Sequence, residues 1–155
     1  MKNVLFLIIV GITMSYGLTI KGVTLGSRGN KNINTTYGGI QVVVSPDTLN
    51  DGRTYSISII PSKDGLHVSR IYNNELSGII KGMENAYGIN FNWYPEYTGS
   101  EDGSFHTEKN GITYTVIVDN NPYFDAPNEV SIWVVNTQLY DMYLAEKQRK
   151  VNADF

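Results

Sequence analysis

The chain has 155 residues, with 12 Lys and Arg against 15 Asp and Glu, and it contains no cysteine. This length and composition indicate one small, mildly acidic domain, and they exclude disulfide bonds, thiol catalysis and thiolate zinc sites. The acidic balance also argues against a nucleic-acid-binding protein, because such proteins gain affinity by neutralising phosphates with basic side chains.

The N-terminal segment has the pattern of a secretory signal peptide. Lys2 precedes an apolar run from Val4 to Val10, and small residues lead up to Gly17. We predict cleavage after Gly17, which divides the chain into a signal peptide, residues 1–17, and a single domain, residues 18–155. The mature chain is then periplasmic or secreted, with no stable membrane span. A retained anchor is the alternative, although a spanning helix needs about 20 apolar residues.

Alternating apolar and polar residues predict half-buried strands along the mature chain. The predicted strands cover residues 40–44, 55–60, 66–72, 112–118 and 130–134. Asp64-Gly65 lies between the second and third of them, and glycine favours the positive φ of a hairpin turn. Residues 55–60 and 66–72 are therefore predicted to pair as one antiparallel hairpin. The segments 27–36 and 98–104, which are polar and rich in glycine, are predicted loops.

Two helices are predicted. The first is indicated by apolar residues at intervals of three and four, namely Leu76, Ile79, Ile80, Met83 and Tyr87. Asn74 is the predicted N-cap and Gly88 the C-terminal stop. Residues 139–151 predict a second, partly docked helix, whose basic side chains at Lys147, Arg149 and Lys150 face solvent. The predicted fold class is α+β, an antiparallel sheet with one amphipathic helix packed on it and a C-terminal helix.

The sequence carries no catalytic motif for histidine, serine or paired carboxylates. His67 and His106 are its two histidines, and there is no HExxH or G-x-S-x-G motif. Both histidines are therefore predicted to be ordinary surface residues. Glu96 lies among aromatic residues, the setting that a glycosidase acid requires, but a solvated position is the favoured interpretation.

Oxygen-bearing side chains at Asp119, Asn121 and Asp125 have the spacing of a possible calcium loop. An EF-hand needs Gly at the sixth position and Glu at the twelfth, and here Phe124 and Val130 occupy them. The EF-hand is excluded and an irregular calcium site stays open. No metal and no cofactor is predicted.

Tyrosine is unusually frequent, with eleven residues in the chain. Tyr55, Tyr72, Tyr87 and Tyr114 fall on apolar stripes and are assigned to the core. The remaining aromatic residues in loops and at strand ends predict a recognition surface, because Tyr and Trp are enriched at interfaces. The predicted binding residues are Trp93, Tyr94, Tyr97, Tyr123 and Phe124.

Three short motifs are Ile20-Lys21-Gly22-Val23-Thr24-Leu25-Gly26 after the signal, Asn85-Ala86-Tyr87-Gly88 at the end of a helix, and the ending Asp154-Phe155. Together they resemble small exported bacterial proteins of uncharacterised families. In such families a G-[IV]-x-L-G strand opens the mature domain and a helix packs on a sheet. The resemblance implies a periplasmic location and no particular activity.

We therefore expect an exported, non-enzymatic binding or interaction protein of the bacterial envelope, such as an inhibitor or immunity-type protein. Its partner is expected to be another protein or an envelope component, not nucleic acid. Two alternatives stay open. One is a small hydrolase of envelope polymer acting through Glu96 or His106. The other is a structural or ligand-carrying envelope domain, which would need an apolar cavity between the helix at 75–87 and the sheet.

Overall fold

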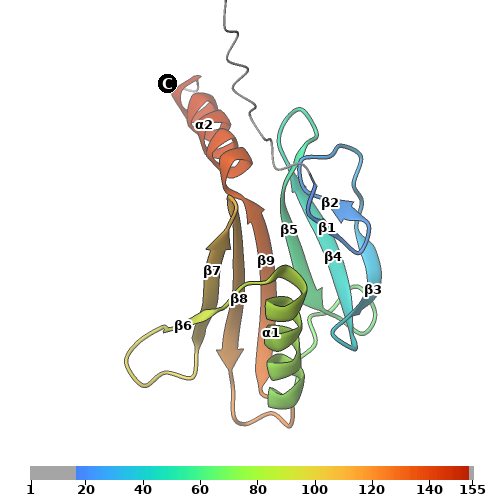
Figure 1. Ribbon diagram of the computed structural model, residues 1–155, viewed down its shortest axis with the longest axis vertical. Coiled ribbons are helices and arrows are strands. Elements are labelled where there is room, and N and C mark those ends of the chain that lie inside the picture. The colour runs from blue at the N-terminus through green and yellow to red at the C-terminus, as the bar shows by residue number, and fades with distance from the viewer. Residues whose placement is uncertain (1–16, 154–155) are drawn as a thin grey trace, which may run out of the picture.

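The computed structural model describes residues 17–153, and the predicted α+β fold is confirmed. Seven antiparallel strands form one sheet in the spatial order β3-β4-β5-β9-β8-β7-β6 (Figure 1). Their bounds are β3 (Ile33–Tyr37), β4 (Ile40–Thr48), β5 (Thr54–Pro61), β6 (Asn92–Pro95), β7 (Gly103–Lys109), β8 (Ile112–Asn120) and β9 (Asn128–Asn136). A separate hairpin consists of β1 (Thr19–Ile20) and β2 (Val23–Thr24). The predicted signal peptide up to residue 16 and the ending Asp154-Phe155 lie outside the described residues.

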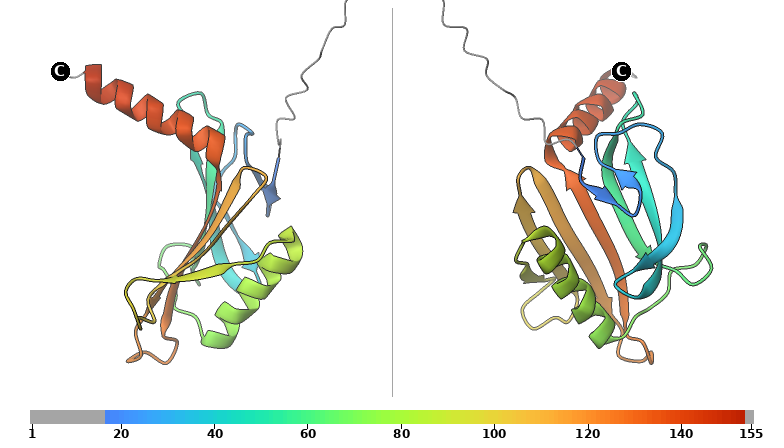
Figure 2. Two further views of the ribbon diagram at one scale, coloured as in Figure 1. Left: turned by 60° about the vertical axis from the view of Figure 1, so that its left-hand side comes forward. Right: turned by 45° about the vertical axis from the view of Figure 1, so that its right-hand side comes forward.

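The sheet is assembled from two meanders that meet at its centre. The strands β3, β4 and β5 follow one another, and so do β6, β7, β8 and β9, with α1 (Asn73–Tyr87) connecting the two groups. The last strand, β9, lies between β5 and β8. Figure 2 shows that α1 and the β1–β2 hairpin lie on one side of the sheet, while α2 (Thr137–Ala153) leaves its upper end toward the other side.

The hydrophobic core lies between the sheet on one side and α1 with the β1–β2 hairpin on the other. Every second residue of the central strands is an aliphatic side chain that points to this face, as in the register pairs Ile57↔Val134 and Ile59↔Ile132. The helix adds Ile79 and Met83, both fully buried. Because a buried aliphatic side chain contributes about 1.5–3 kcal/mol, this face supplies most of the stability of the fold.

Helix α1 is held at both ends by other parts of the chain. Its N-cap is Tyr72 rather than the predicted Asn74, and the Glu75 carboxylate of the first turn accepts the Tyr72 backbone N–H at 2.7 Å. Gly88 ends the helix as predicted, in a left-handed conformation with φ 61°. The last turn has no basic residue of its own, and the Lys109 ammonium of β7 donates to the Gly88 carbonyl at 2.8 Å instead.

The predicted hairpin of residues 55–60 and 66–72 is wrong. β5 pairs with β4 and β9, and most of 66–72 is irregular, with Leu66 85% exposed. The cause is a local turn, because the Asp64 carboxylate accepts the Leu66 and His67 N–H groups at 2.9 Å and directs the chain out of the sheet. The segment returns to the sheet at two points, where the Ser69 N–H donates to the Pro61 carbonyl at 2.8 Å and where Ile71 forms an isolated bridge to Asn128.

Three smaller expectations also differ from the structure. The predicted loop 27–36 contains most of β3, and the predicted loop 98–104 ends where β7 begins at Gly103. Tyr72, assigned to the core, is exposed because it precedes α1 instead of lying in a strand. Tyr114 is buried as expected.

The predicted C-terminal helix is confirmed as α2, and only a narrow strip of its surface contacts the rest of the chain. Leu139 is its only fully buried residue within the described part of the chain. Further along, the Glu146 carboxylate accepts the Asn50 N–H at 3.2 Å, and the Lys150 ammonium donates to the Asn50 side chain at 3.2 Å. Within residues 17–153, no helix combines the length and the apolar character that crossing a membrane requires.

Candidate binding groove

The face of the sheet opposite α1 is lined by small hydroxyl-bearing side chains around one tryptophan. Trp133 of β9 lies between Ser58 of β5 and Thr115 of β8 in the strand register. Because both neighbouring side chains are small, they leave part of the indole ring uncovered, and Trp133 is only half-buried. Its Nε1–H donates to the Ser131 hydroxyl at 3.2 Å, which fixes the ring on this face.

Helix α2 and this face enclose a groove of about 470 Å³. Strands β4, β5, β8 and β9 and the first two turns of α2 provide its walls. The lining residues are Asp47, Tyr55, Ser56, Thr113, Thr115, Ile117, Trp133, Val135, Thr137, Tyr140 and Tyr143. The volume falls within the range of small-molecule sites, about 300–1,000 Å³.

Three tyrosines form the wall where α2 meets β5. The rings of Tyr55 and Tyr143 are stacked with centroids 4.7 Å apart, and Tyr140 lies 5.9 Å from each of them. Tyr140 and Tyr143 are three residues apart and so project from neighbouring positions on one side of α2. This cluster attaches the helix to the sheet and presents aromatic surface to the groove.

Two polar groups in the groove have unmet interactions. The hydroxyl of Ser56 is buried, with the residue only 2% exposed. Within residues 17–153 it makes no hydrogen bond of regular geometry, and the acceptor beside it is the Asp47 carboxylate. Asp47, opposite Ser56 in the register, is half-buried, and no Lys, Arg or His of the described chain pairs with it. Burial raises the pKa of Asp47, and the Ser56 hydroxyl beside it lowers that pKa slightly.

The negative charge of Asp47 contributes to the raised pKa of the neighbouring Tyr55. Burial, followed by the charge of Asp47, raises the pKa of Tyr55 to about 12. Tyr55 therefore stays a neutral hydroxyl at physiological pH. No basic side chain lines the groove, so its electrostatic character is negative.

The structure places the five predicted binding residues on β6, in the β6–β7 loop and in the β8–β9 loop. Trp93 and Tyr94 are adjacent on β6 and point to opposite faces of the sheet. Trp93 contacts Phe105 with centroids 4.7 Å apart, and Tyr94 lies edge-on to His106. Tyr97 follows in the β6–β7 loop and is exposed.

The remaining two predicted residues lie in the β8–β9 loop. Tyr123 is 94% exposed, whereas Phe124 packs beneath the Arg70 guanidinium, 4.7 Å from the ring centroid. The same guanidinium lies 3.3 Å from the Glu129 carboxylate. Phe124 thus has an internal partner, and Tyr123 is the most accessible of the five.

The two histidines have structural partners. His67 is exposed, as expected, and its Nδ1 lies 2.7 Å from the Asp64 carboxylate, which raises the pKa of His67 and lowers that of Asp64. His106 is half-buried rather than exposed, because it lies under Tyr94 and hydrogen-bonds the Thr115 hydroxyl at 3.1 Å.

The alternative catalytic residue Glu96 is exposed, at the start of the β6–β7 loop. A general acid of a glycosidase requires an apolar enclosure that keeps it protonated, and the exposed position of Glu96 does not provide one. The β6–β7 loop is instead closed by hydrogen bonds, since the Asp102 carboxylate accepts the Asn120 N–H at 2.6 Å.

The segment that holds Asp119, Asn121 and Asp125 forms a turn. The Asn121 side-chain oxygen accepts the Tyr123 N–H at 3.2 Å, and the Asn121 carbonyl accepts the Phe124 N–H at 3.2 Å. Among residues 17–153, no three His, Asp or Glu side chains are grouped closely enough to hold a metal ion.

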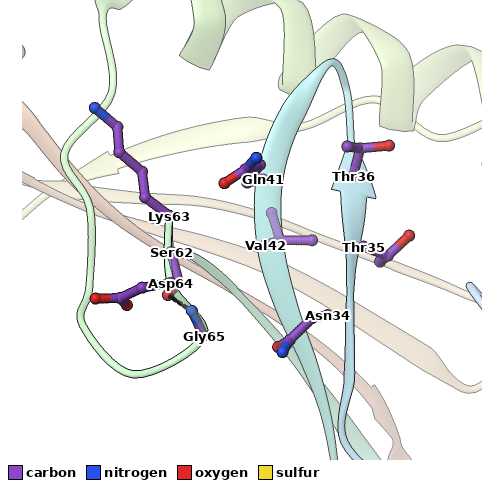
Figure 3. A pocket seen from close by; sticks show the side chains of 9 residues that line it. All are labelled: Asn34, Thr35, Thr36, Gln41, Val42, Ser62, Lys63, Asp64 and Gly65. Carbon is purple, nitrogen blue, oxygen red and sulfur yellow. Dashed lines mark hydrogen bonds between the residues drawn. The ribbon is translucent and has the colours of Figure 1, made fainter.

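A second hollow lies between edge strand β3 and the turn after β5 (Figure 3). It measures about 390 Å³ and is lined by Asn34, Thr35, Thr36, Gln41, Val42, Ser62, Lys63, Asp64 and Gly65. The charged ends of Lys63 and Asp64 point away from β3, while the Asn34 side chain points toward Gly65 (Figure 3). Among the described residues no aromatic side chain lines this hollow, and its polar groups come from β3, β4 and the turn after β5, so the groove beneath α2 is the stronger candidate.

Sequence reasoning missed the groove for an identifiable reason. Tyr55 was assigned to the core from its place in an alternating strand, and Tyr140 and Tyr143 lie in a helix with weak periodicity. The available signal was the outward stripe Thr113, Thr115 and Ile117, which is too apolar for a fully solvated face. Comparison of the chain with protein-family models, curated proteins and solved structures finds no match, so function must be argued from this geometry.

Proposed function

We propose that the chain is an exported, non-enzymatic binding protein of the bacterial envelope, and that it holds its ligand in the groove beneath α2. The observation that carries the proposal is the open sheet face with its aromatic wall and the buried Ser56 hydroxyl, which makes no hydrogen bond of regular geometry within residues 17–153. A buried hydroxyl without a partner costs free energy, and a ligand that hydrogen-bonds to it would remove that cost.

This proposal includes the ligand-carrying alternative, but it places the ligand on the face of the sheet opposite α1 and not between α1 and the sheet. The space between α1 and the sheet is filled by core residues such as Ile79 and Met83. A hydrolase receives less support, because Glu96 is exposed and His106 contacts a threonine instead of a carboxylate.

Photocrosslinking tests the position of the site. A benzophenone amino acid placed at Ile117, which lines the groove and is 46% exposed, is expected to give a specific adduct in envelope extract. The same amino acid at Asn85, exposed on α1, serves as the control. An adduct at position 85 but not at 117 would place binding elsewhere and contradict the proposal.

Export is tested on the full chain with its natural N-terminus. After expression in a Gram-negative host, mass spectrometry of the periplasmic fraction is expected to find a mature chain that begins at Leu18. An intact chain beginning at Met1 and confined to the cytosol would refute the export part of the proposal.

A second candidate surface is supported by one observation, the 94% exposure of Tyr123. An aromatic side chain at a loop tip suits recognition of a protein partner. Capture of one defined envelope protein by the wild-type chain, lost in Tyr94→Ala/Tyr123→Ala, would favour this surface over the groove.

A further inference from the structure

We propose that the groove beneath α2 binds a small organic ammonium compound, with Asp47 as the counter-ion and the tyrosine and tryptophan rings as the contact surface. This inference rests on the proposed function and specifies its ligand class. Three independent features of the groove support it: its charge, its aromatic surface and its unmet polar groups.

The first feature is the uncompensated charge of Asp47. The other aspartates with close cations, Asp51 and Asp64, have them at 2.7 Å, from Arg53 and His67. Asp47 is half-buried and receives no such partner from the described residues, although its burial makes a lone charge costly. A cation in the groove would supply what the chain does not.

The second feature is the aromatic surface beside this carboxylate. Cations are attracted to the faces of Tyr and Trp rings, and aromatic surroundings are suited to alkylated ammonium groups, which hydrogen-bond poorly. Tyr55, Tyr140 and Trp133 all line the groove with Asp47. Anionic ligands are disfavoured, because no Lys, Arg or His lines it.

The third feature is a buried polar group that could form a hydrogen bond with a hydroxyl of the ligand. Within residues 17–153 the buried Ser56 hydroxyl makes no hydrogen bond of regular geometry, and it lies beside the Asp47 carboxylate, opposite it in the strand register. A ligand with a cationic centre and a hydroxyl on the second carbon from it could engage both groups. The volume of about 470 Å³ accommodates such a small molecule.

Choline is a suitable probe because 3,3-dimethyl-1-butanol is its neutral isostere. The chain has two tryptophans, so Trp93→Phe leaves Trp133, inside the groove, as the single tryptophan, whose emission is excited selectively over that of the tyrosines. In this background, choline is expected to change Trp133 fluorescence saturably and to bind about ten-fold or more tightly than the isostere.

Asp47→Asn is expected to remove most of the preference for choline over its isostere. Asp125→Asn deletes the same charge from the β8–β9 loop and is expected to leave that preference unchanged. Circular dichroism and thermal melting of each variant confirm that the fold is retained. Equal binding of choline and its isostere, or no response to either, overturns the ammonium inference. If the crosslink at position 117 still forms in that case, the proposed function stands and only its ligand class fails.

Discussion

At the scale of single residues, Asp47 combines a structural cost with a proposed functional role. Its carboxylate is half-buried, lacks a cation partner within residues 17–153 and has a raised pKa. A raised pKa means that folding favours the protonated form. The contribution to stability is thus present below the ordinary aspartate pKa of about 3.9 and is lost as pH rises through the folded-state value.

Asp47→Asn is therefore expected to stabilise the free protein at pH 7, by less than about 1 kcal/mol because the group is partly screened by solvent. The gain should vanish near pH 3, where the wild-type carboxyl is protonated in both states. Urea denaturation of both proteins at the two pH values measures this. A variant less stable than wild type at pH 7 would show that Asp47 makes a favourable interaction in the free protein.

At the scale of elements, the turn between β3 and β4 fixes the position of α1. Gly38 and Gly39 both have positive φ, of 58° and 87°. A Cβ at Gly38 would lie 3.1 Å from the Ile79 side chain, whereas a Cβ at Gly39 would meet nothing within 4 Å. The turn thus touches the helix at one glycine and not at its neighbour.

Gly39→Ala is expected to cost about 1 kcal/mol, from the positive φ alone. Gly38→Ala should cost at least roughly 1 kcal/mol more, because its methyl group also presses on Ile79. Chemical denaturation of the two variants isolates this contact from the shared backbone strain. Equal losses would show that Ile79 adjusts freely and that the turn does not constrain α1.

The elements themselves were largely predictable, and their arrangement was not. The periodicity that includes Ile79 and Met83 predicted α1, and the alternation of β8 and β9 is visible in the sequence. The strand prediction for residues 66–72 failed because side-chain oxygens of Ser62 and Asp64 accept hydrogen bonds from backbone N–H groups at the start of this segment. A strand paired with β5 would have needed its backbone N–H groups for the sheet. Alternation alone cannot distinguish a strand from a turn stabilised in this way.

The candidate site was less predictable for a related reason. Its aromatic wall joins Tyr55 to Tyr143, two residues separated by most of the domain. No local pattern encodes that contact, which depends on the direction in which α2 leaves β9. The predicted aromatic residues were chosen by composition, and the structure distributes them over both faces and two loops.

At the scale of the whole molecule, the two helices differ in how firmly they are attached. Helix α1 packs into the core and is held at both ends, whereas α2 is attached through Leu139, the tyrosine cluster and a few polar contacts to Asn50. A helix with few buried apolar contacts opens locally more easily than the core.

Hydrogen exchange is expected to show this difference. Amides of residues 147–153 should be protected at least about ten-fold less than those around Ile79 and Met83. Tyr143→Ala should extend the fast exchange to the first turn of α2, while Tyr123→Ala, in a distant loop, should not. Equal protection of both helices would indicate that α2 is a rigid wall of the groove.

The position of β9 has a consequence for how the chain is made. This strand spans Asn128–Asn136, near the end of the sequence, yet it joins the two meanders at the centre of the sheet. During synthesis, β5 lacks one of its two neighbours until β9, the last strand of the sheet, has left the ribosome. The contacts that complete the sheet are among the most distant in sequence, which slows folding. A sheet completed in this order stays open late, and this would suit the proposed export, because an exported chain crosses the membrane before it folds.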